Sequence, residues 1–269
     1  MCTIGAIILG EEEYLLFKNK DFARPTFNDR IVSKKDWFGP RGLETFNEDP
    51  ARPDVYSGLS IGANKHGLLA CVNHVKITDP ENANYDILVE IALSEARDVE
   101  SAKQTIEEYL ANQACWWGNV VLTDGKTVAA VEVRDQEMRI EESESRLVRT
   151  NHQPMFGEEE SPDGVECSAN RFFSADLRIS IIESTEEVFE MLAAHDDGRT
   201  GICNHRKQMN TVYSYVLHVN PDRTRIYLCQ GNPCKSPRSA MRVPLGKSWS
   251  PDAAKKFITH YPGGETAPD

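Results

Sequence analysis

Cys2 is the residue whose type and position offer the clearest chemistry in this chain. Because a small residue after an initiator methionine favours removal of that methionine, we expect the mature chain to begin with Cys2. Its α-amino group would have a reference pKa of about 7.7–8.0, close enough to neutrality to accept the thiol proton. One residue would then supply both the nucleophile and the base. A buried structural thiol in a first strand is the competing interpretation.

A predicted β-hairpin brings a carboxylate back to this thiol. Strand-like runs at 3–9 and 14–20 flank a short turn, so Cys2 lies opposite Asn19 or Asp21, according to where the turn is centred. A carboxylate at this position can orient an α-ammonium group and change its pKa. We therefore expect Asp21 to belong to the site.

Two lysines accompany that carboxylate in the second strand of the hairpin. Lys18 and Lys20 are adjacent to the predicted partners of Cys2, and a cation beside a thiol favours the thiolate. We expect Lys18 to take this role and Lys20 to be an ordinary surface charge.

Amide and guanidinium groups elsewhere in the chain could complete a catalytic site. Asn73 and Asn151 cannot ionise and could donate hydrogen bonds to a developing oxyanion, although turn formation is the commoner role of asparagine at a strand end. The planar fork of Arg171 could pair with a carboxylate such as Asp21. Its competing role is a surface ion pair worth under about 1 kcal/mol.

The elements that must position these residues are hairpins and helices. Antiparallel strand pairs with helices between them, without strict strand–helix–strand alternation, indicate an α+β fold of stacked antiparallel sheets covered by helices. Further strands are predicted at 56–61, 67–75, 118–123, 127–134, 138–142, 213–219 and 225–229. Apolar residues at three- and four-residue spacing predict helices at 87–96, 99–112 and 185–195.

Composition narrows the class of protein. The formal net charge of −12 argues against a protein that follows nucleic-acid phosphates, and no apolar run approaches the roughly 20 residues of a membrane span. The N-terminus lacks the features of a signal peptide, and the seven cysteines show no regular framework, so we expect a cytoplasmic protein. Since no linker marks a boundary, we expect a single domain over residues 1–269, with residues 261–269 as a frayed tail.

Several segments, in order, resemble the motifs of one enzyme superfamily. These segments are Met1-Cys2-Thr3, residues 18–21, residues 63–68 leading to Val72-Asn73, residues 117–133, residues 150–154 and residues 167–172. Together they resemble the choloylglycine hydrolase and penicillin V acylase family and the related isopenicillin N acyltransferase-like hydrolases, which cleave linear amide bonds. The resemblance covers most of the chain to about residue 172.

The resemblance implies a fold and a reaction. The fold would be the four-layer αββα sandwich of N-terminal-nucleophile hydrolases, and the reaction would cleave a small N-acyl amide through a thioester on Cys2. The backbone N–H of Asn73 and the side chain of Asn151 would stabilise the oxyanion, and Arg171 would help to hold the cluster. The resemblance also implies a homo-oligomer. Lys18 departs from the family pattern, which has an arginine there, and lysine lacks the bidentate fork.

Alternatives remain open at this point. The same machinery could serve an acyltransferase of the isopenicillin N type. A non-enzymatic relative with a structural Cys2 is also possible, since a similar start occurs in the transport-and-Golgi-organisation family. Residues 22–54 are expected to line the pocket, but their mixed composition does not fix the acyl group.

Other cysteines and histidines are given no role. Cys203 with His205, and Cys229 with Cys234, suggest zinc, but without a second pair to complete four ligands we expect no metal and no cofactor. His152 as the partner of another cysteine lacks support.

Overall fold

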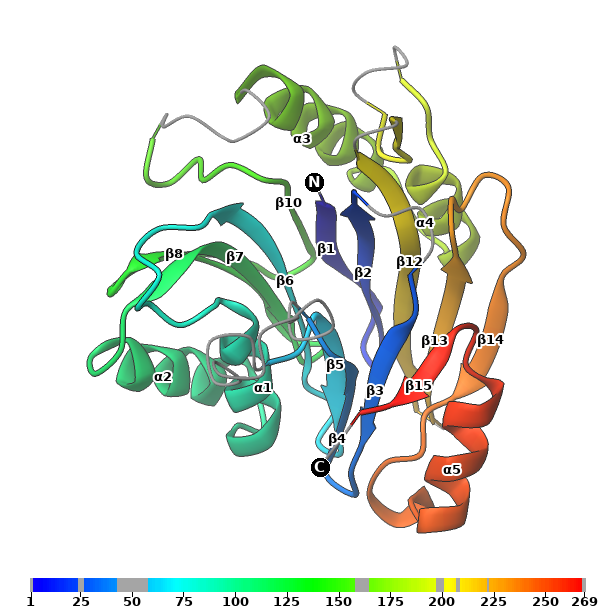
Figure 1. The fold of residues 1–269 in the computed structure, drawn as a ribbon. Helices are drawn as coiled ribbons and strands as arrows, with labels where there is room; N and C mark the ends of the chain where they lie inside the picture. Colours follow the sequence, from blue (N-terminus) through cyan, green and yellow to red (C-terminus); the bar gives the residue numbers. More distant parts are fainter. Residues whose placement is uncertain are drawn as a thin grey trace.

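The computed structural model describes residues 2–23, 27–42, 58–157, 165–196, 201–206, 209–221 and 223–267. Two β-sheets lie face to face, with helices against their outer faces (Figure 1). The helices are α1 (Asp86–Glu95), α2 (Val99–Leu110), α3 (Val165–Ile179), α4 (Thr185–Leu192) and α5 (Pro251–His260).

The first sheet has the strand order β10-β1-β2-β12-β13-β14, and β11 pairs with β12. Its strands are β1 (Cys2–Gly10), β2 (Glu13–Phe22), β10 (Arg146–Arg149), β11 (His205–Arg206), β12 (Met209–Asn220), β13 (Arg223–Gln230) and β14 (Ser239–Arg242).

The second sheet has the strand order β15-β3-β4-β5-β6-β7-β8-β9. Its strands are β3 (Asp29–Ser33), β4 (Trp37–Pro40), β5 (Ile61–Asn64), β6 (Leu69–Lys76), β7 (Cys115–Thr123), β8 (Val128–Asp135), β9 (Glu137–Ser143) and β15 (Gly264–Thr266). The pairing of β15 with β3 is parallel, so this sheet is mixed.

The side chains of β2 show how the layers arise. Because successive strand residues point to opposite faces, Leu16 packs between the two sheets, whereas Leu15 and Phe17 pack toward α3 and α4. A third apolar cluster joins the other sheet to α1 and α2, with Val72 and Leu88 among its members. The order of layers is therefore helix, sheet, sheet, helix. The α+β class and the four-layer αββα sandwich predicted from the sequence are confirmed.

Two helices begin where the sequence indicated. The Asp98 carboxylate accepts a hydrogen bond of 2.8 Å from the backbone N–H of Ser101, and Ser184 caps α4 in the same way by accepting from Glu187. Such caps satisfy donors that the first helical turn leaves unpaired. The sequence did not predict α3, β3, β4 or α5.

The register of the first hairpin differs from the prediction by one residue. Gly10 pairs with Glu13 across the turn, but an irregularity follows Ile8, and Cys2 then lies opposite Lys20 rather than Asn19 or Asp21. A bulge adds one residue to one strand, which a count from the turn cannot foresee. Since directly opposed residues share a face, Cys2 shares its face of the sheet with Lys20.

The C-terminal segment packs on the second sheet as far as residue 267, although the sequence predicted a frayed tail from residue 261. After α5 the chain forms β15, and Ala267 is buried with an N–H that donates to the carbonyl of Ile31 at 3.1 Å. Phe257 of α5 packs edge-on against Phe38 of β4. These contacts hold the C-terminal residues to the second sheet, so the prediction for 261–269 is wrong up to residue 267.

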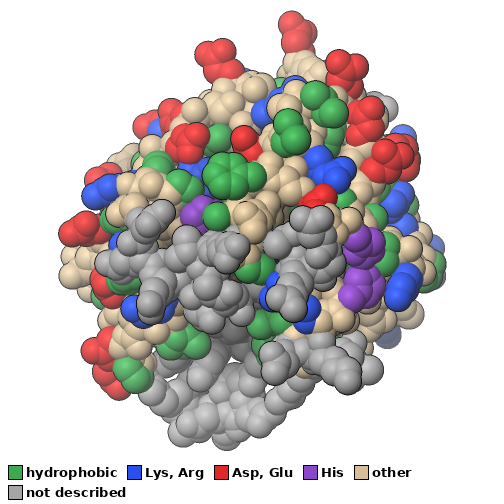
Figure 2. Space-filling model, turned by 90° about the horizontal axis from the view of Figure 1, so that it is seen from above, with side chains coloured by type: hydrophobic (Ala, Val, Ile, Leu, Met, Phe, Trp, Pro, Cys, Tyr) green, Lys and Arg blue, Asp and Glu red, His purple; other side chains and the backbone are tan. Residues whose placement is uncertain are grey.

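The face seen from above has acidic side chains distributed around its rim (Figure 2), in keeping with the formal net charge of −12. Among the helices in the described ranges, none is both long and apolar enough to cross a membrane.

Candidate active site

Cys2 opens into a cavity of about 220 Å³ at the end of the two sheets where the chain begins. The lining combines the thiol with two lysines, two carboxylates and several apolar side chains. Its residues are Cys2, Lys18, Lys20, Asp21, Phe22, Gly42, Ser60, Val72, Asn73, His74, Ile77, Tyr85, Asp86 and Met209. Four of the six predicted site residues therefore share one cavity.

The other two predicted residues hold the backbone of Cys2. The backbone nitrogen of Cys2 donates a hydrogen bond of 2.7 Å to Oδ1 of Asn151, and Arg171 donates to that same oxygen at 2.9 Å. Arg171 also donates to the carbonyl of Cys2 at 2.8 Å. With Arg171 only 1% exposed, these bonds fix the position of Cys2 from both sides of its backbone.

Asn151 has its amide oriented by three partners. Its oxygen accepts from Cys2 and Arg171, and its Nδ2 donates to the carbonyl of His74 at 2.5 Å. Two N–H donors can meet only the oxygen end of an amide, so this network defines which end faces Cys2. Asn151 thus contacts Cys2 at its backbone nitrogen. Donation to an oxyanion stays a prediction.

Asn73 uses its side chain to hold the segment that carries Asn151. Nδ2 of Asn73 donates to the carbonyl of Thr150 at 3.0 Å, and Nδ2 of Asn119 donates to the same carbonyl at 2.7 Å. The predicted role of Asn73 lies in its backbone N–H, which is compatible with a side chain engaged elsewhere.

Lys18 is buried in the lining of the cavity that also contains the Cys2 thiol. It is 4% exposed, and its ammonium donates to the carbonyls of Val72 at 2.6 Å and Ser60 at 3.1 Å. Burial lowers the pKa of Lys18, while the nearby Cys2 and Asp86 groups act in the opposite direction. Backbone carbonyls thus hold this cation without a bidentate fork.

The prediction that Lys20 is a surface charge is wrong. Lys20 is buried, forms an ion pair of 3.1 Å with Asp29, and lies 4.4 Å from the centre of the Phe27 ring. Asp29 also accepts hydrogen bonds from the hydroxyls of Tyr215 at 2.6 Å and Tyr261 at 2.8 Å. A second buried cation therefore lies opposite Cys2.

Asp21 borders the cavity, but its hydrogen bonds differ from those expected. Its carboxylate accepts from the Thr211 hydroxyl at 2.7 Å and from the Asn204 amide at 3.2 Å. Burial raises the pKa of Asp21, and the nearby Arg171 charge and these two hydrogen bonds oppose the rise. Arg171 donates to Asn151 and Cys2 instead of forming the predicted fork on Asp21.

The sequence reasoning missed several lining residues, among them Asp86 and Tyr85. Asp86 is buried in the first turn of α1, and its charge raises the pKa of Lys18 against the effect of burial. Tyr85 precedes it, and burial raises the pKa of its hydroxyl well above the ordinary value. An acidic residue in a first helical turn is common, so the sequence offered no signal that this one faces a cavity. In the predicted pocket-lining segment 22–54, residues 24–26 and 43–54 lie outside the described residues, as does Met1.

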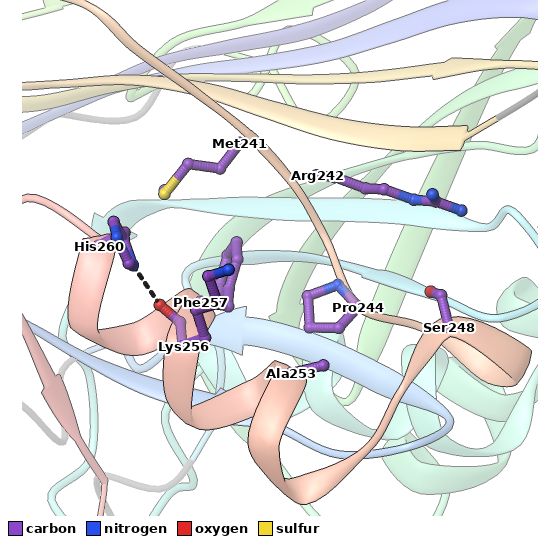
Figure 3. Close-up of a pocket in the computed structure, with 8 residues that line it drawn as sticks. All are labelled: Met241, Arg242, Pro244, Ser248, Ala253, Lys256, Phe257 and His260. Atoms are coloured by element: carbon purple, nitrogen blue, oxygen red, sulfur yellow. Dashed lines mark hydrogen bonds between the residues drawn. The ribbon is translucent and has the colours of Figure 1, made fainter.

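A larger hollow of about 400 Å³ lies between β14 and α5, and Figure 3 shows Met241 above the helix that carries Phe257 and His260. His260 Nδ1 contacts the carbonyl of Lys256 at 2.7 Å, an interaction within the helix itself. None of the six predicted site residues lines this hollow, so we place the candidate active site at Cys2.

Two remaining predictions concern histidine and metal. His152 contacts Ser168 at 2.9 Å and Thr150 at 3.1 Å, away from the cavity, and burial lowers its pKa to about 4. The structure brings His195 together with Cys203, His205 and Cys234, so four potential ligands converge where the sequence showed one close pair, and the absence of a metal stays a prediction.

Comparison with known proteins defines the family. The profile of the family described as acyl-coenzyme A:6-aminopenicillanic acid acyl-transferase matches residues 8–235. The chain belongs to this family. No curated protein sequence gives a significant match.

Solved structures share the fold of this family member. Penicillin V acylase from Agrobacterium tumefaciens is 16% identical with a TM-score of 0.51, over 90% of this chain and 86% of that one. The mutant C2A of conjugated bile acid hydrolase from Clostridium perfringens is 13% identical with a TM-score of 0.52, over 90% and 96%. The N-acylethanolamine-hydrolyzing acid amidase ortholog of Caenorhabditis elegans is 9% identical with a TM-score of 0.52, over 80% and 92%. At such identities the likeness concerns the fold alone, whereas the match to the acyl-transferase family over residues 8–235 confirms the predicted superfamily.

Proposed function

We propose that this protein is an amidohydrolase that cleaves a linear, non-peptide amide through an N-terminal Cys2 nucleophile. The observation that carries the proposal is the 2.7 Å hydrogen bond from the Cys2 nitrogen to Asn151 at the mouth of a cavity. When Met1 is removed, this nitrogen becomes the α-amino group, and Asn151 with Arg171 holds it in a defined position beside its own thiol. A base fixed next to its nucleophile is what nucleophilic catalysis requires.

The reaction divides into acylation and deacylation. The α-amine takes the thiol proton, and the sulfur attacks the amide carbonyl to form a carbon–sulfur bond. The backbone N–H of Asn73 and the side chain of Asn151 stabilise the tetrahedral oxyanion. The ammonium proton then passes to the leaving nitrogen as the carbon–nitrogen bond breaks. Water attacks the resulting thioester, which releases a carboxylic acid and returns the proton to the sulfur.

Charged side chains in the same cavity support the assignment of Cys2 as the nucleophile. Lys18 and Lys20 line the cavity on the same face of the sheet as Cys2, and a nearby cation favours a thiolate. Asp21 borders the cavity at the end of β2, where a carboxylate can stabilise the ammonium form of the base.

The cavity also supports a substrate class. Apolar side chains of Phe22, Val72, Ile77 and Met209 line it together with Tyr85, which favours an apolar or aryl acyl group on the carbonyl side of the amide. Its polar groups lie near Cys2, where the scissile bond would be bound. We therefore propose N-acyl compounds as substrates, tested first with penicillin V, conjugated bile salts, N-acylethanolamines and N-acyl amino acids.

Intact-mass analysis and substitution of the nucleophile test the proposal together. We expect the purified protein to lack Met1, and we expect Cys2→Ala to lose all turnover of any substrate found in the screen while remaining folded. Cys229→Ala serves as the matched control, because Cys229 is buried in β13 and lines no part of this cavity. Retention of Met1 in active protein, or turnover by Cys2→Ala, would contradict the mechanism.

Alkylation gives an independent test that needs no substrate. Burial raises the pKa of Cys71 to about 12 and also raises that of Cys229, so both thiols should react slowly with iodoacetamide at neutral pH. We expect Cys2 to be labelled before Cys71 and Cys229, as read by peptide mapping over time. Equal labelling rates for the three would indicate a structural Cys2.

Acyl transfer is the second candidate, favoured by the family description. The same thioester would then be attacked by an amine, and a new amide would replace the acid product. Product analysis with and without an added amine acceptor separates the two functions, because only a transferase forms the new amide faster than the acid.

A further inference from the structure

Four potential metal ligands converge at the loop that follows α4. His195, Cys203, His205 and Cys234 each direct one ligand atom into a space where all four atoms lie within 4.8 Å of one another. They come from three separate segments, which are the end of α4, the segment around β11 and the turn after β13. We propose that these four residues form a tetrahedral zinc site.

The distances among the ligand atoms support this geometry. The sulfurs of Cys203 and Cys234 are 3.7 Å apart, and Nε2 of His205 lies 3.5 Å from the first and 3.1 Å from the second. With zinc–sulfur bonds of about 2.3 Å and zinc–nitrogen bonds of about 2.0–2.1 Å, tetrahedral ligands are separated by about 3.3–3.8 Å. The rings of His195 and His205 have centroids 4.8 Å apart, so a small rotation of the exposed His195 ring completes the set.

The chemistry of the donors selects the metal. Two thiolates and two imidazoles in a tetrahedral arrangement are characteristic of zinc, and two thiolates neutralise its charge. A disulfide between Cys203 and Cys234 would need a sulfur separation of about 2.05 Å and would give no reason for an imidazole nitrogen beside both sulfurs. The position of His205 therefore favours a metal over a disulfide.

Hydrogen bonds hold the backbone of the cluster in place without the metal. The N–H of Cys203 donates to the carbonyl of Ala194 at 3.0 Å, which places Cys203 beside His195. Asn232 donates to the carbonyl of Asn204 at 2.8 Å, and its own carbonyl accepts from Ser236 at 2.8 Å in the turn that carries Cys234. Because the ligands are preorganised, little further ordering is needed for binding.

The proposed zinc site is connected to the candidate active site through Asp21. Asn204 stands between the ligands Cys203 and His205, and its amide donates to Asp21 at 3.2 Å. The carbonyl of Ile202 accepts from Asn19 at 3.0 Å, next to Asp21 on β2. A metal here would fix the segment 202–205 and with it the Asp21 carboxylate. This positioning role rests on the proposed function, whereas metal binding does not.

Metal content is the direct test. The full chain, expressed with zinc and reductant and then passed over a chelating resin, should retain about one zinc per chain in elemental analysis. Cys234→Ser and His205→Gln should each lower the zinc content at least roughly tenfold, whereas the control Cys229→Ser should retain it. Cobalt substitution should give the visible absorption of a tetrahedral thiolate site in the parent protein and not in Cys234→Ser.

Stability and activity separate the two parts of the inference. A chelator should lower the Tm of the parent protein and of Cys229→Ser, and should leave Cys234→Ser unchanged. If the positioning role holds, Cys234→Ser should also lower kcat more than it changes KM. Zinc binding with unchanged kcat would overturn the positioning role alone. A parent protein without zinc, or one that holds a Cys203–Cys234 disulfide under the same reducing conditions, would overturn the site.

Discussion

Near Cys2, the two faces of β2 carry different polar residues. One face has two lysines, and the other has an asparagine and an aspartate. Lys18 and Lys20 point between the sheets and form the pocket face, where each has its charge held by carbonyls or by Asp29. Asn19 and Asp21 point outward and form the helix face, where they bond to the segments after α4 and around β11.

This difference shows how one short segment can contribute to a reaction through one face and to the stability of the fold through the other. Residues on the pocket face line the cavity with Cys2, so their substitution should change the reaction more than the stability. Asn19, on the helix face, joins β2 to α4 and to residue 202, so its loss should lower stability more than the rate of the reaction. Asp21 belongs to the helix face by direction and also borders the cavity, so it should affect both.

The largest effect is expected at Asn151, which accepts the hydrogen bond from the nitrogen of the proposed nucleophile. Asn151→Ala should lower kcat about 10²–10³-fold, because it removes the acceptor of the Cys2 nitrogen and the proposed oxyanion donor. Asn151→Asp keeps an acceptor and loses the donor, so steady-state kinetics of the pair separate the two roles. Near-normal kcat in Asn151→Asp would contradict the oxyanion role, and a loss below tenfold in Asn151→Ala would contradict both.

The next effect tests the pocket face at Lys18. Lys18→Met should lower kcat/KM about 10²-fold, because the proposed thiolate loses its nearby buried cation. Stability should change little, since burial disfavours the charge that the substitution removes. Lys18→Arg is the control that restores the charge. A variant with normal activity and lower Tm would assign Lys18 to architecture and break the comparison.

Asn19 tests the helix face. Asn19→Ala should lower the free energy of unfolding by about 2 kcal/mol, because the buried carbonyls of Leu192 and Ile202 lose their donor. Denaturant titration measures this loss, and kcat for the folded fraction should stay within a few-fold of the parent value. A large fall in kcat at unchanged stability would show that the two faces are not separable.

The smallest effect is a pH dependence at His152, which contacts Ser168 of α3. Burial lowers the pKa of His152 from 6.5 to about 4, so between these values the unfolded chain binds a proton that the folded protein excludes. Stability that is present above pH 6.5 should therefore be lost as the pH falls toward 4. Denaturation midpoints across this range should fall less steeply for His152→Gln than for the parent. The exposed His66→Gln is the control, and equal slopes for the three proteins would contradict the assignment.

The sequence predicted the fold better than the contacts within the site. Alternation and helical spacing are local signals, and they located three of the helices and most of the predicted strands. The strand predicted at 56–61 forms instead at Ile61–Asn64. The partner of Cys2 was missed by one residue, because the irregularity after Ile8 leaves no mark in the apolar pattern. The fork of Arg171 was assigned to Asp21, whereas the folded chain brings it to Cys2 and Asn151.

The metal ligands illustrate the limit of spacing arguments. Zinc motifs are recognised when pairs of ligands are close in sequence, and only Cys203 and His205 satisfy that condition. His195 and Cys234 are brought to them by the pairing of β12 with its neighbours, which no local pattern encodes. Asp86 was missed for the same reason, since its place beside Lys18 depends on the packing of α1 against the sheet.

The pairing of β2 with β12 sets an order of events during synthesis. Thr211 and Asp21, which meet in the folded protein, are 190 residues apart in the chain. At about 5–20 residues per second, a ribosome needs roughly 10–40 s to make the intervening segment. During that interval the N-terminal hairpin lacks its neighbour β12 on one side and the late-made loop that holds Asp21. In the proposed mechanism, an aminopeptidase would therefore have its best access to Met1 before the C-terminal third of the chain has emerged. The proposed nucleophile would then be exposed before its site is assembled.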